Sequence, residues 1–228
     1  MSIYDNVQSV LEKAARAAER SGRRPDEVLV IGVTKTVGVD KVWEMVRAGI
    51  TTAGENRVQE LLAKKEQMPD LPFHMIGHLQ SNKVKQAVAA ADMIHSVDSL
   101  RIAELVDKYA AESGKKMDIL VQINVGDEDT KFGIPANQAF EFVSSIAQFR
   151  HISVRGLMCI APFVENQEKN RPHFQKMFQI YVDIKHKIAH NKHKLDTLSM
   201  GMTLDYEVAI EEGATMVRIG TAIFGERS

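Results

Sequence analysis

Short apolar runs alternate with segments of helical periodicity along the 228 residues of the chain. The runs are rich in Val, Ile and Leu without a strict polar–apolar alternation, which is typical of parallel strands buried on both faces. Between them, apolar positions recur every three to four residues and predict amphipathic helices, the first at about residues 5–20. The expected strands lie at residues 28–34, 51–54, 73–77, 92–97, 118–125, 153–158, 194–200 and 215–220.

The alternation of strands and helices predicts the fold class. About eight strand–helix units are present, and eight such units close a (β/α)8 barrel. We therefore predict an α/β fold of the TIM-barrel type, with an extra N-terminal helix and a single domain over residues 1–228. The chain is somewhat shorter than the ~250 residues usual for this barrel, which implies short loops. A doubly wound open sheet shows the same alternation and remains an alternative.

Composition and charge narrow the class of protein. Lys and Arg number 29 against 30 Asp and Glu, so the formal net charge of −1 gives no overall attraction to nucleic acid. No apolar run approaches the ~18 residues of a membrane span. Cys159 is the single cysteine, which excludes an internal disulfide, and the N-terminal segment lacks the apolar core of a signal peptide. We expect a cytoplasmic protein.

One lysine stands at the end of the first apolar run, LVIGVTKTVG at residues 29–38. Because side chains alternate along a strand, Lys35 shares a face with Val33 and Ile31, whereas Gly32 lies on the other face, where a helix can pack closely. We expect Lys35 to point into the barrel at its C-terminal mouth and to be desolvated, which favours a nucleophilic amine. Such an amine forms a Schiff base with a carbonyl, either a substrate's or that of pyridoxal phosphate. A lysine that only solvates the strand end is the alternative.

The two last strand ends suggest a phosphate site. Barrels commonly bind phosphate in the loops after the seventh and eighth strands, against a helix N-terminus. The first loop contains Ser199 and Gly201 and precedes a helix expected at about Thr203; the second contains Gly220 and Thr221. The hydroxyls of Ser199 and Thr221 and the backbone of the two glycines are the candidate donors. Ordinary tight turns are the alternative interpretation.

Arg218 lies within the last expected strand, on the face of Met216. A guanidinium inside a barrel needs a partner, either a structural carboxylate or the ring nitrogen of a bound cofactor. Because arginine stays protonated, it would keep a pyridine nitrogen unprotonated and weaken the ring as an electron sink. The arginine would therefore disfavour rapid turnover.

The ordered set of motifs resembles the pyridoxal-phosphate homeostasis protein family, the single-domain relatives of the alanine racemase barrel. The resemblance covers nearly the whole chain. It depends on VTKT around Lys35, GENRVQE, HMIGHLQSNK, SVDSLRIA, INVGDEDTKFGI, GLMCIAP, SMGMTLDYEVAI and VRIGTAIFGER. Family members often read SK at the lysine, followed by a polar or basic residue and a proline. Here the sequence is TK followed by TVGVD, which alters the rim beside the lysine.

The resemblance implies roles for particular residues. Lys35 would hold pyridoxal 5'-phosphate (PLP) covalently as an internal aldimine, and Asn56 would approach the cofactor ring. The other implied positions are pocket-lining Met158 and Met200, phosphate-binding Ser199, Gly220 and Thr221, and Arg218 at the pyridine nitrogen.

The resemblance also implies a function and its alternatives. Such proteins are regarded as carriers or regulators of PLP that influence amino-acid and keto-acid pools, with no established reaction of their own. We expect a monomeric or weakly associating protein whose partners are PLP and, through delivery, PLP-dependent apoenzymes. The alternatives are an amino-acid racemase, with Lys35 alone transferring the proton, and an aldolase whose lysine attacks a sugar phosphate. The racemases carry a second domain with a catalytic tyrosine, which we do not expect here.

Several other polar residues receive structural interpretations. His186, His190 and His193 lie in the stretch KHKIAHNKHK, where neighbouring lysines disfavour a metal ion. Cys159 is expected to be a buried, inert thiol. His74 and His78 flank the third strand end, where His78 either lines the pocket or is a hydrogen-bonded rim residue.

Overall fold

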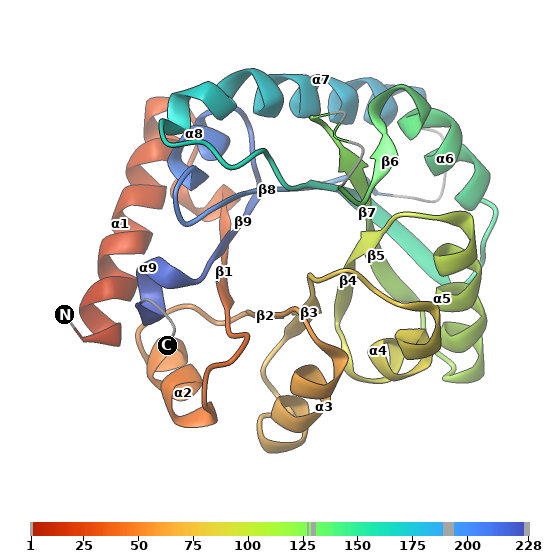
Figure 1. Cartoon of the computed structure of the whole chain (residues 1–228), viewed down its shortest axis with the longest axis horizontal. Coiled ribbons are helices and arrows are strands. Elements are labelled where there is room, and N and C mark those ends of the chain that lie inside the picture. Colours follow the sequence, from red (N-terminus) through yellow and green to blue (C-terminus); the bar gives the residue numbers. More distant parts are fainter. Residues whose placement is uncertain (1, 127, 129–130, 189–193, 226–228) are drawn as a thin grey trace.

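The computed structural model describes residues 2–126, 128, 131–188 and 194–225, and its strands form a closed parallel ring (Figure 1). The strand order is β4-β3-β2-β1-β9-β8-β7-β5, and a further pairing of β4 with β5 closes it. This closure excludes the open doubly wound sheet and confirms the (β/α)8 barrel. The ring strands are β1 (Leu29–Val33), β2 (Ala53–Glu55), β3 (Phe73–Met75), β4 (Met93–Val97), β5 (Met117–Asn124), β7 (Ile152–Cys159), β8 (Thr197–Met202) and β9 (Met216–Ile219).

Each predicted strand is present, with ends shifted by a few residues. A further short strand, β6 (Ile134–Pro135), pairs with the end of β5 outside the ring. It was not predicted because two residues carry no periodicity.

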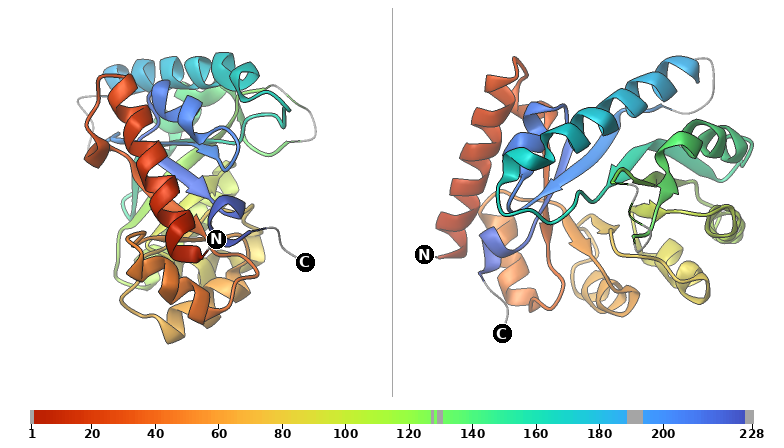
Figure 2. Two further views of the ribbon diagram at one scale, coloured as in Figure 1. Left: turned by 90° about the vertical axis from the view of Figure 1, so that its left-hand side faces the viewer. Right: turned by 45° about the horizontal axis from the view of Figure 1, so that its top comes forward.

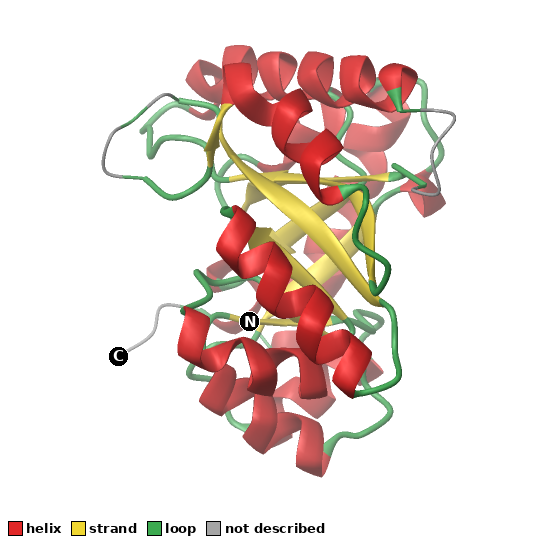
Figure 3. Cartoon of the chain, turned by 90° about the vertical axis from the view of Figure 1, so that its right-hand side faces the viewer, coloured by secondary structure: helices red, strands yellow, loops and turns green. Residues whose placement is uncertain are grey.

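Helices surround the ring, as the end-on and side views show (Figures 1 and 3). None of the helices in the described ranges combines the length and apolarity that crossing a membrane requires. The α-helices are α1 (Ile3–Arg20), α2 (Val39–Arg47), α3 (Val58–Gln67), α4 (Val84–Ala90), α5 (Leu100–Glu112), α6 (Ala139–Ile146), α7 (Arg171–Lys187), α8 (Tyr206–Glu211) and α9 (Thr221–Phe224). Short 3-10 turns η1 (Pro25–Glu27), η2 (Ser81–Lys83), η3 (Ala136–Gln138) and η4 (Gln167–Asn170) join some of them.

The predicted extra N-terminal helix is α1, which packs outside the ring against α2, α8 and α9 (Figure 2). It begins at Ile3 because Ser2 and Asp5 form a reciprocal capping box, in which each side chain accepts the backbone N–H of the other residue. Its buried face includes Val7, Val10 and Ala14, so apolar packing holds it on the barrel.

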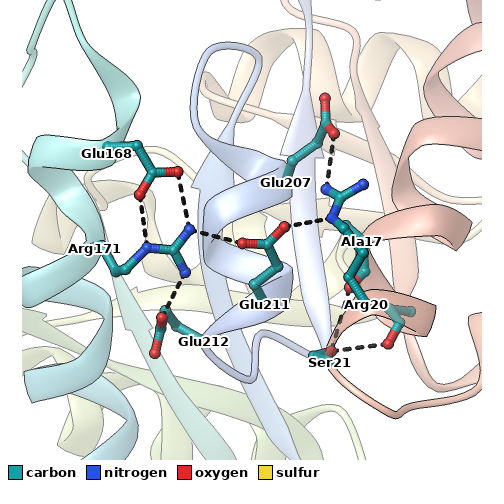
Figure 4. A network of polar contacts seen from close by, with 9 residues as sticks. Ala17, Arg20, Ser21, Glu168, Arg171, Glu207, Glu211 and Glu212 are labelled. Atoms are coloured by element: carbon teal, nitrogen blue, oxygen red, sulfur yellow. Dashed lines mark hydrogen bonds and ion pairs between the residues drawn. The ribbon is translucent and has the colours of Figure 1, made fainter.

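Ion pairs connect α1, α8 and α7 on the surface (Figure 4). The Glu211 carboxylate of α8 accepts from Arg20 of α1 and from Arg171 of α7, each over 2.7 Å. Arg171 also donates to Glu212 over 2.7 Å. Linked groups of charges are worth more than isolated surface pairs. They fix α8, which follows the loop after β8.

The barrel interior and the layer beneath the helices are separate hydrophobic clusters. Ile31, Leu120, Met158 and Met216 belong to the interior cluster. Gly32, the neighbour of Ile31, faces outward, where an added Cβ would lie 2.0 Å from Sδ of Met45. The predicted alternation along β1 is therefore confirmed, and it directs Val33 and Lys35 to the inside.

Candidate functional site

A cavity of about 410 Å³ opens at the C-terminal mouth of the barrel. It lies between the ends of β1 and β9 and the loops that follow β7 and β8. This is the end at which barrel enzymes carry their chemistry. Its cationic lining residues are Lys35, Lys131 and Arg218, its hydroxyl residues are Thr203 and Thr221, and its apolar wall includes Ile160, Phe163, Met202 and Leu204.

Lys35 lines this cavity, but its side chain is exposed. The expectation of a desolvated amine is wrong for this structure. Strand β1 ends at Val33, so Lys35 lies in the turn beyond the sheet, and its long side chain extends into the open mouth. Its position on the inward face, beside Val33, agrees with the sequence prediction.

Arg218 forms the inner wall of the same cavity and is only 4% exposed. Its guanidinium donates to Ser199 Oγ over 2.6 Å and to the Cys159 carbonyl over 2.8 Å. Within the described ranges no carboxylate forms an ion pair with it, and burial lowers its pKa. A buried guanidinium held only by neutral acceptors is costly for folding. Such a cost is consistent with a functional role for the charge.

From the end of β8 and the loop after it, the cavity receives the hydroxyl of Thr203 and not that of Ser199. Ser199 was expected in the rim loop, but β8 continues to Met202, and the Ser199 side chain lies fully buried inside the barrel. Thr203 lines the cavity, and its Oγ1 accepts the N–H of Gly220 over 3.2 Å. Thr203 was expected at a helix start, whereas α8 begins at Tyr206. Gly220 and Thr221 line the cavity as expected.

Four other implied residues lie outside the cavity lining. Met200 faces outward into the layer beneath the helices, and Met158 packs in the barrel interior below the cavity. Gly201 adopts φ +90°, and an added Cβ would lie 2.6 Å from Cβ of Ala209, so the glycine permits close packing of α8. Asn56 is half-buried after β2. A pocket-lining role for Met200 is therefore wrong, and Met202 occupies that place.

A hydrogen-bonded chain extends from Arg218 into the barrel. Ser199 Oγ lies 3.3 Å from Nδ1 of His95, and His95 Nε2 lies 3.0 Å from Nδ1 of His74. Because Arg218 only donates, Ser199 accepts from it and is free to donate to His95, which in turn donates to His74. Burial lowers the pKa of His74 to about 4 and that of His95 well below its usual value. Both imidazoles are neutral at pH 7.

The histidines near β3 differ in their surroundings. His74 is buried within β3 rather than at the rim. His78 Nδ1 lies 3.2 Å from the Asp98 carboxylate, and its ring stacks on Phe132 with centroids 3.7 Å apart. His78 is therefore a hydrogen-bonded rim residue, one of the two predicted outcomes.

The remaining polar candidates agree with structural roles. Cys159 is fully buried, and burial raises its pKa to about 12, so the thiol is unreactive as predicted. His186 lies in α7, whereas His190 and His193 lie outside the described residues. The described part of the chain holds no group of three potential metal ligands.

Comparison with known proteins gives full-length matches. Residues 6–228 match the family described as alanine racemase, N-terminal domain. The pyridoxal phosphate homeostasis protein of Aquifex aeolicus is 40% identical over 231 residues, which cover 100% of this chain and 99% of that protein. The protein of the same name from Escherichia coli K12 is 36% identical, covering 99% and 97%.

Solved structures also match this chain over most of its length. A protein described as unknown from Bifidobacterium adolescentis has a TM-score of 0.90 and 33% identity, covering 97% of this chain and 94% of its own. PipY of Synechococcus elongatus, solved with PLP bound, has a TM-score of 0.80 and 34% identity, covering 93% and 100%. An alanine racemase of Clostridium difficile, at 17% identity and a TM-score of 0.75, shares the fold over 98% of this chain and 60% of its own.

Proposed function

Since the chain belongs to the pyridoxal phosphate homeostasis protein family, built on the alanine racemase N-terminal domain, we propose that it binds PLP in the cavity at the barrel mouth. Its role is to store the cofactor and deliver it to PLP-dependent apoenzymes. One observation carries the proposal: Lys35 and Arg218 line one cavity. Lys35 provides a primary amine, and Arg218 provides a buried guanidinium that forms no ion pair with a carboxylate among the described residues.

The cavity fits each part of PLP. Arg218 would supply a positive charge for the pyridine nitrogen, since its own hydrogen-bond partners, the Ser199 hydroxyl and the Cys159 carbonyl, are neutral. Thr203 and Thr221 would supply hydroxyl donors for the phosphate, whereas the N–H of Gly220 already donates to Thr203. Thr221 also begins α9, and the first N–H groups of a helix have no partners within it. A cavity of about 410 Å³ lies in the range common for small-molecule sites.

The similar proteins support the same ligand. The A. aeolicus and E. coli proteins are named for PLP homeostasis, and PipY was solved with PLP bound. The aldolase alternative finds no support among these names.

We further propose that Lys35 holds PLP covalently. The amine of Lys35 condenses with the aldehyde of the ligand to a C=N bond and releases one water. Bound PLP can act as an electron sink for amino-acid chemistry. In this chain Arg218, placed at the pyridine nitrogen, would keep that nitrogen unprotonated and so weaken this capacity.

Other titratable groups of the cavity are already engaged. Lys131 pairs with Glu128 over 2.6 Å, and Asp205 accepts from the N–H of Met202 and from Asn170, each over 2.8 Å. Racemisation requires proton transfer on both faces of a carbanion, and neither group is free to serve opposite Lys35. Binding rather than turnover is therefore the proposed activity.

Titration of PLP-free protein with PLP tests the proposal. We expect one equivalent to bind with a new absorbance band in the wild type and in Lys41→Ala, an exposed lysine on α2. Lys35→Ala should lose the band. Amino acids incubated with the loaded protein in deuterated buffer should keep their α-hydrogen; rapid exchange would favour the racemase alternative.

A further inference from the structure

The turn that carries Lys35 has a strained backbone. The N–H of Val37 donates to the carbonyl of Thr34 over 3.0 Å, which places Lys35 and Thr36 at the two central positions of a β-turn. Thr36 has φ +59°, and within the described residues it is the one non-glycine with a positive φ. Glycine or asparagine normally takes such a position, and for a β-branched residue it is an outlier. Surrounding contacts must therefore hold this conformation.

Two side chains of α3 hold both sides of this turn. Lys64 Nζ donates to the carbonyl of Thr34 over 2.6 Å, just before Lys35. The Glu60 carboxylate accepts the N–H of Thr36 over 2.6 Å, just after it. The backbone polar groups on either side of Lys35 are thus bound by charged groups, and such hydrogen bonds are the strongest of their kind.

Lys64 is itself fixed by a buried carboxylate. Its Nζ also donates to Glu55 Oε1 over 2.6 Å, and the hydroxyl of Thr34 donates to the same oxygen over 2.6 Å. The side chains of Lys64 and Glu55 are 8% and 0% exposed. Burial raises the pKa of Glu55, and its hydrogen bonds from Lys64 and Thr34 oppose this shift.

The buried pair of Glu55 and Lys64 is not explained by a contribution to folding stability. A buried ion pair often contributes less than apolar side chains of similar volume would, and Glu55 Oε2 is buried without a hydrogen-bond partner among the described residues. None of Glu55, Glu60 and Lys64 lines the cavity. What the three residues do together is fix the turn between Thr34 and Thr36.

We propose that Glu60 and Lys64 are positioning residues that hold the Lys35 turn so that the amine faces the PLP cavity. This inference depends on the proposed function, because it assigns the purpose of the turn to cofactor capture. Thr34 is anchored on the outer face of the barrel, so the next side chain, Lys35, is directed inward. Without the anchors, Thr36 relaxes to a negative φ and the direction of Lys35 is no longer fixed.

Glu60 offers a matched set of variants for the test. Glu60→Ala removes the acceptor for the Thr36 N–H, whereas Glu60→Gln keeps a side-chain oxygen that accepts it. Glu66→Ala makes the same charge change at an exposed position of α3. We expect Glu60→Ala to weaken PLP binding about tenfold and to slow formation of the absorbance band, with Glu60→Gln and Glu66→Ala close to the wild type.

Amide hydrogen exchange of PLP-free protein gives a second readout. The Thr36 N–H should exchange at least tenfold faster in Glu60→Ala than in Glu60→Gln. The double variant Glu55→Met/Lys64→Met removes the anchor at Thr34 without leaving one buried charge alone, and it should weaken PLP binding in the same way.

Each outcome decides a different claim. Faster exchange with unchanged PLP affinity and unchanged band formation in Glu60→Ala would overturn the positioning role while leaving the proposed function intact. Unchanged exchange would show that Glu60 does not hold the turn. If wild type and Glu66→Ala also fail to take up PLP, the proposed function fails, and the positioning role fails with it.

Discussion

Arg218 donates a 2.6 Å hydrogen bond to the hydroxyl of Ser199 inside the barrel, and this pair connects the cavity to two buried histidines. The hydrogen-bond partners of the guanidinium are both neutral, the Ser199 hydroxyl and the Cys159 carbonyl. A charge held in this way costs stability, and it is available to a ligand.

Replacing Arg218 should therefore affect the folding stability and the bound cofactor differently. In Arg218→Met, the side chain keeps much of its volume and loses its charge. We expect the free energy of unfolding to stay equal or to rise by about 1 kcal/mol, while the absorbance of bound PLP shifts because the charge at the ring nitrogen is lost. Denaturant unfolding and absorbance spectra measure the two effects.

Arg155→Met is the matched control. Arg155 bridges Asp118 and Asp196 over 2.7 and 2.6 Å at the opposite end of the barrel. Its replacement should lower stability and leave the cofactor spectrum unchanged. An unchanged spectrum in Arg218→Met would show that the arginine is structural.

The buried histidine pair predicts a pH dependence of stability. The pKa of His74 is about 4 in the folded state, against an ordinary value near 6.5 in the unfolded chain. Between these two pH values the unfolded chain binds a proton at His74 that the folded protein does not bind. The contribution of neutral His74 to the free energy of unfolding is therefore fully present above pH 6.5 and is lost as the pH falls toward 4. The loss attributable to His74 is roughly 3 kcal/mol.

Urea unfolding at pH 7 and pH 4.5 checks this dependence. His74→Gln cannot titrate and should lose less stability over this interval than the wild type does. Equal losses in the two proteins would assign the acid sensitivity to other groups.

Thr203 is expected to bind the phosphate of the cofactor. Thr203→Val keeps the shape of the side chain and removes the hydroxyl. Because a hydrogen bond to a charged group is worth about 1.5–3 kcal/mol, PLP binding should weaken at least tenfold while binding of pyridoxal, which lacks the phosphate, changes little. Parallel titrations with the two ligands measure the ratio. A loss of phosphate preference in Ser199→Ala but not in Thr203→Val would restore Ser199 as the phosphate ligand.

The sequence was sufficient to predict the alternation of strands and helices and the direction of the side chains along the first strand. Strands buried on both faces leave clear apolar runs, and alternation along residues 29–35 correctly directed Ile31 and Val33 inward and Gly32 toward α2. Ring closure depends on the pairing of β4 with β5, which no local pattern encodes. It was inferred from the number of units.

The residues at which strands end and loops begin could not be predicted from the sequence. Strand β8 continues to Met202, with a register shift between Ser199 and Met202, so Ser199 lies within the strand and not in the loop where it was expected. Met200 was assigned to the pocket by the family resemblance, which does not fix the direction of a side chain. The exposure of Lys35 follows from a turn whose holding groups, Glu60 and Lys64, lie some 25 residues away and are recognised only in three dimensions. Charged positions on a helix are usually solvated, so these two gave no signal.

The most direct test of the central claim is peptide mapping of PLP-loaded protein after borohydride reduction, which makes a C=N bond permanent. We expect one cofactor-derived mass increment per chain, on the peptide that contains Lys35. An increment on another lysine, or bound PLP that leaves every lysine unmodified after reduction, would contradict it.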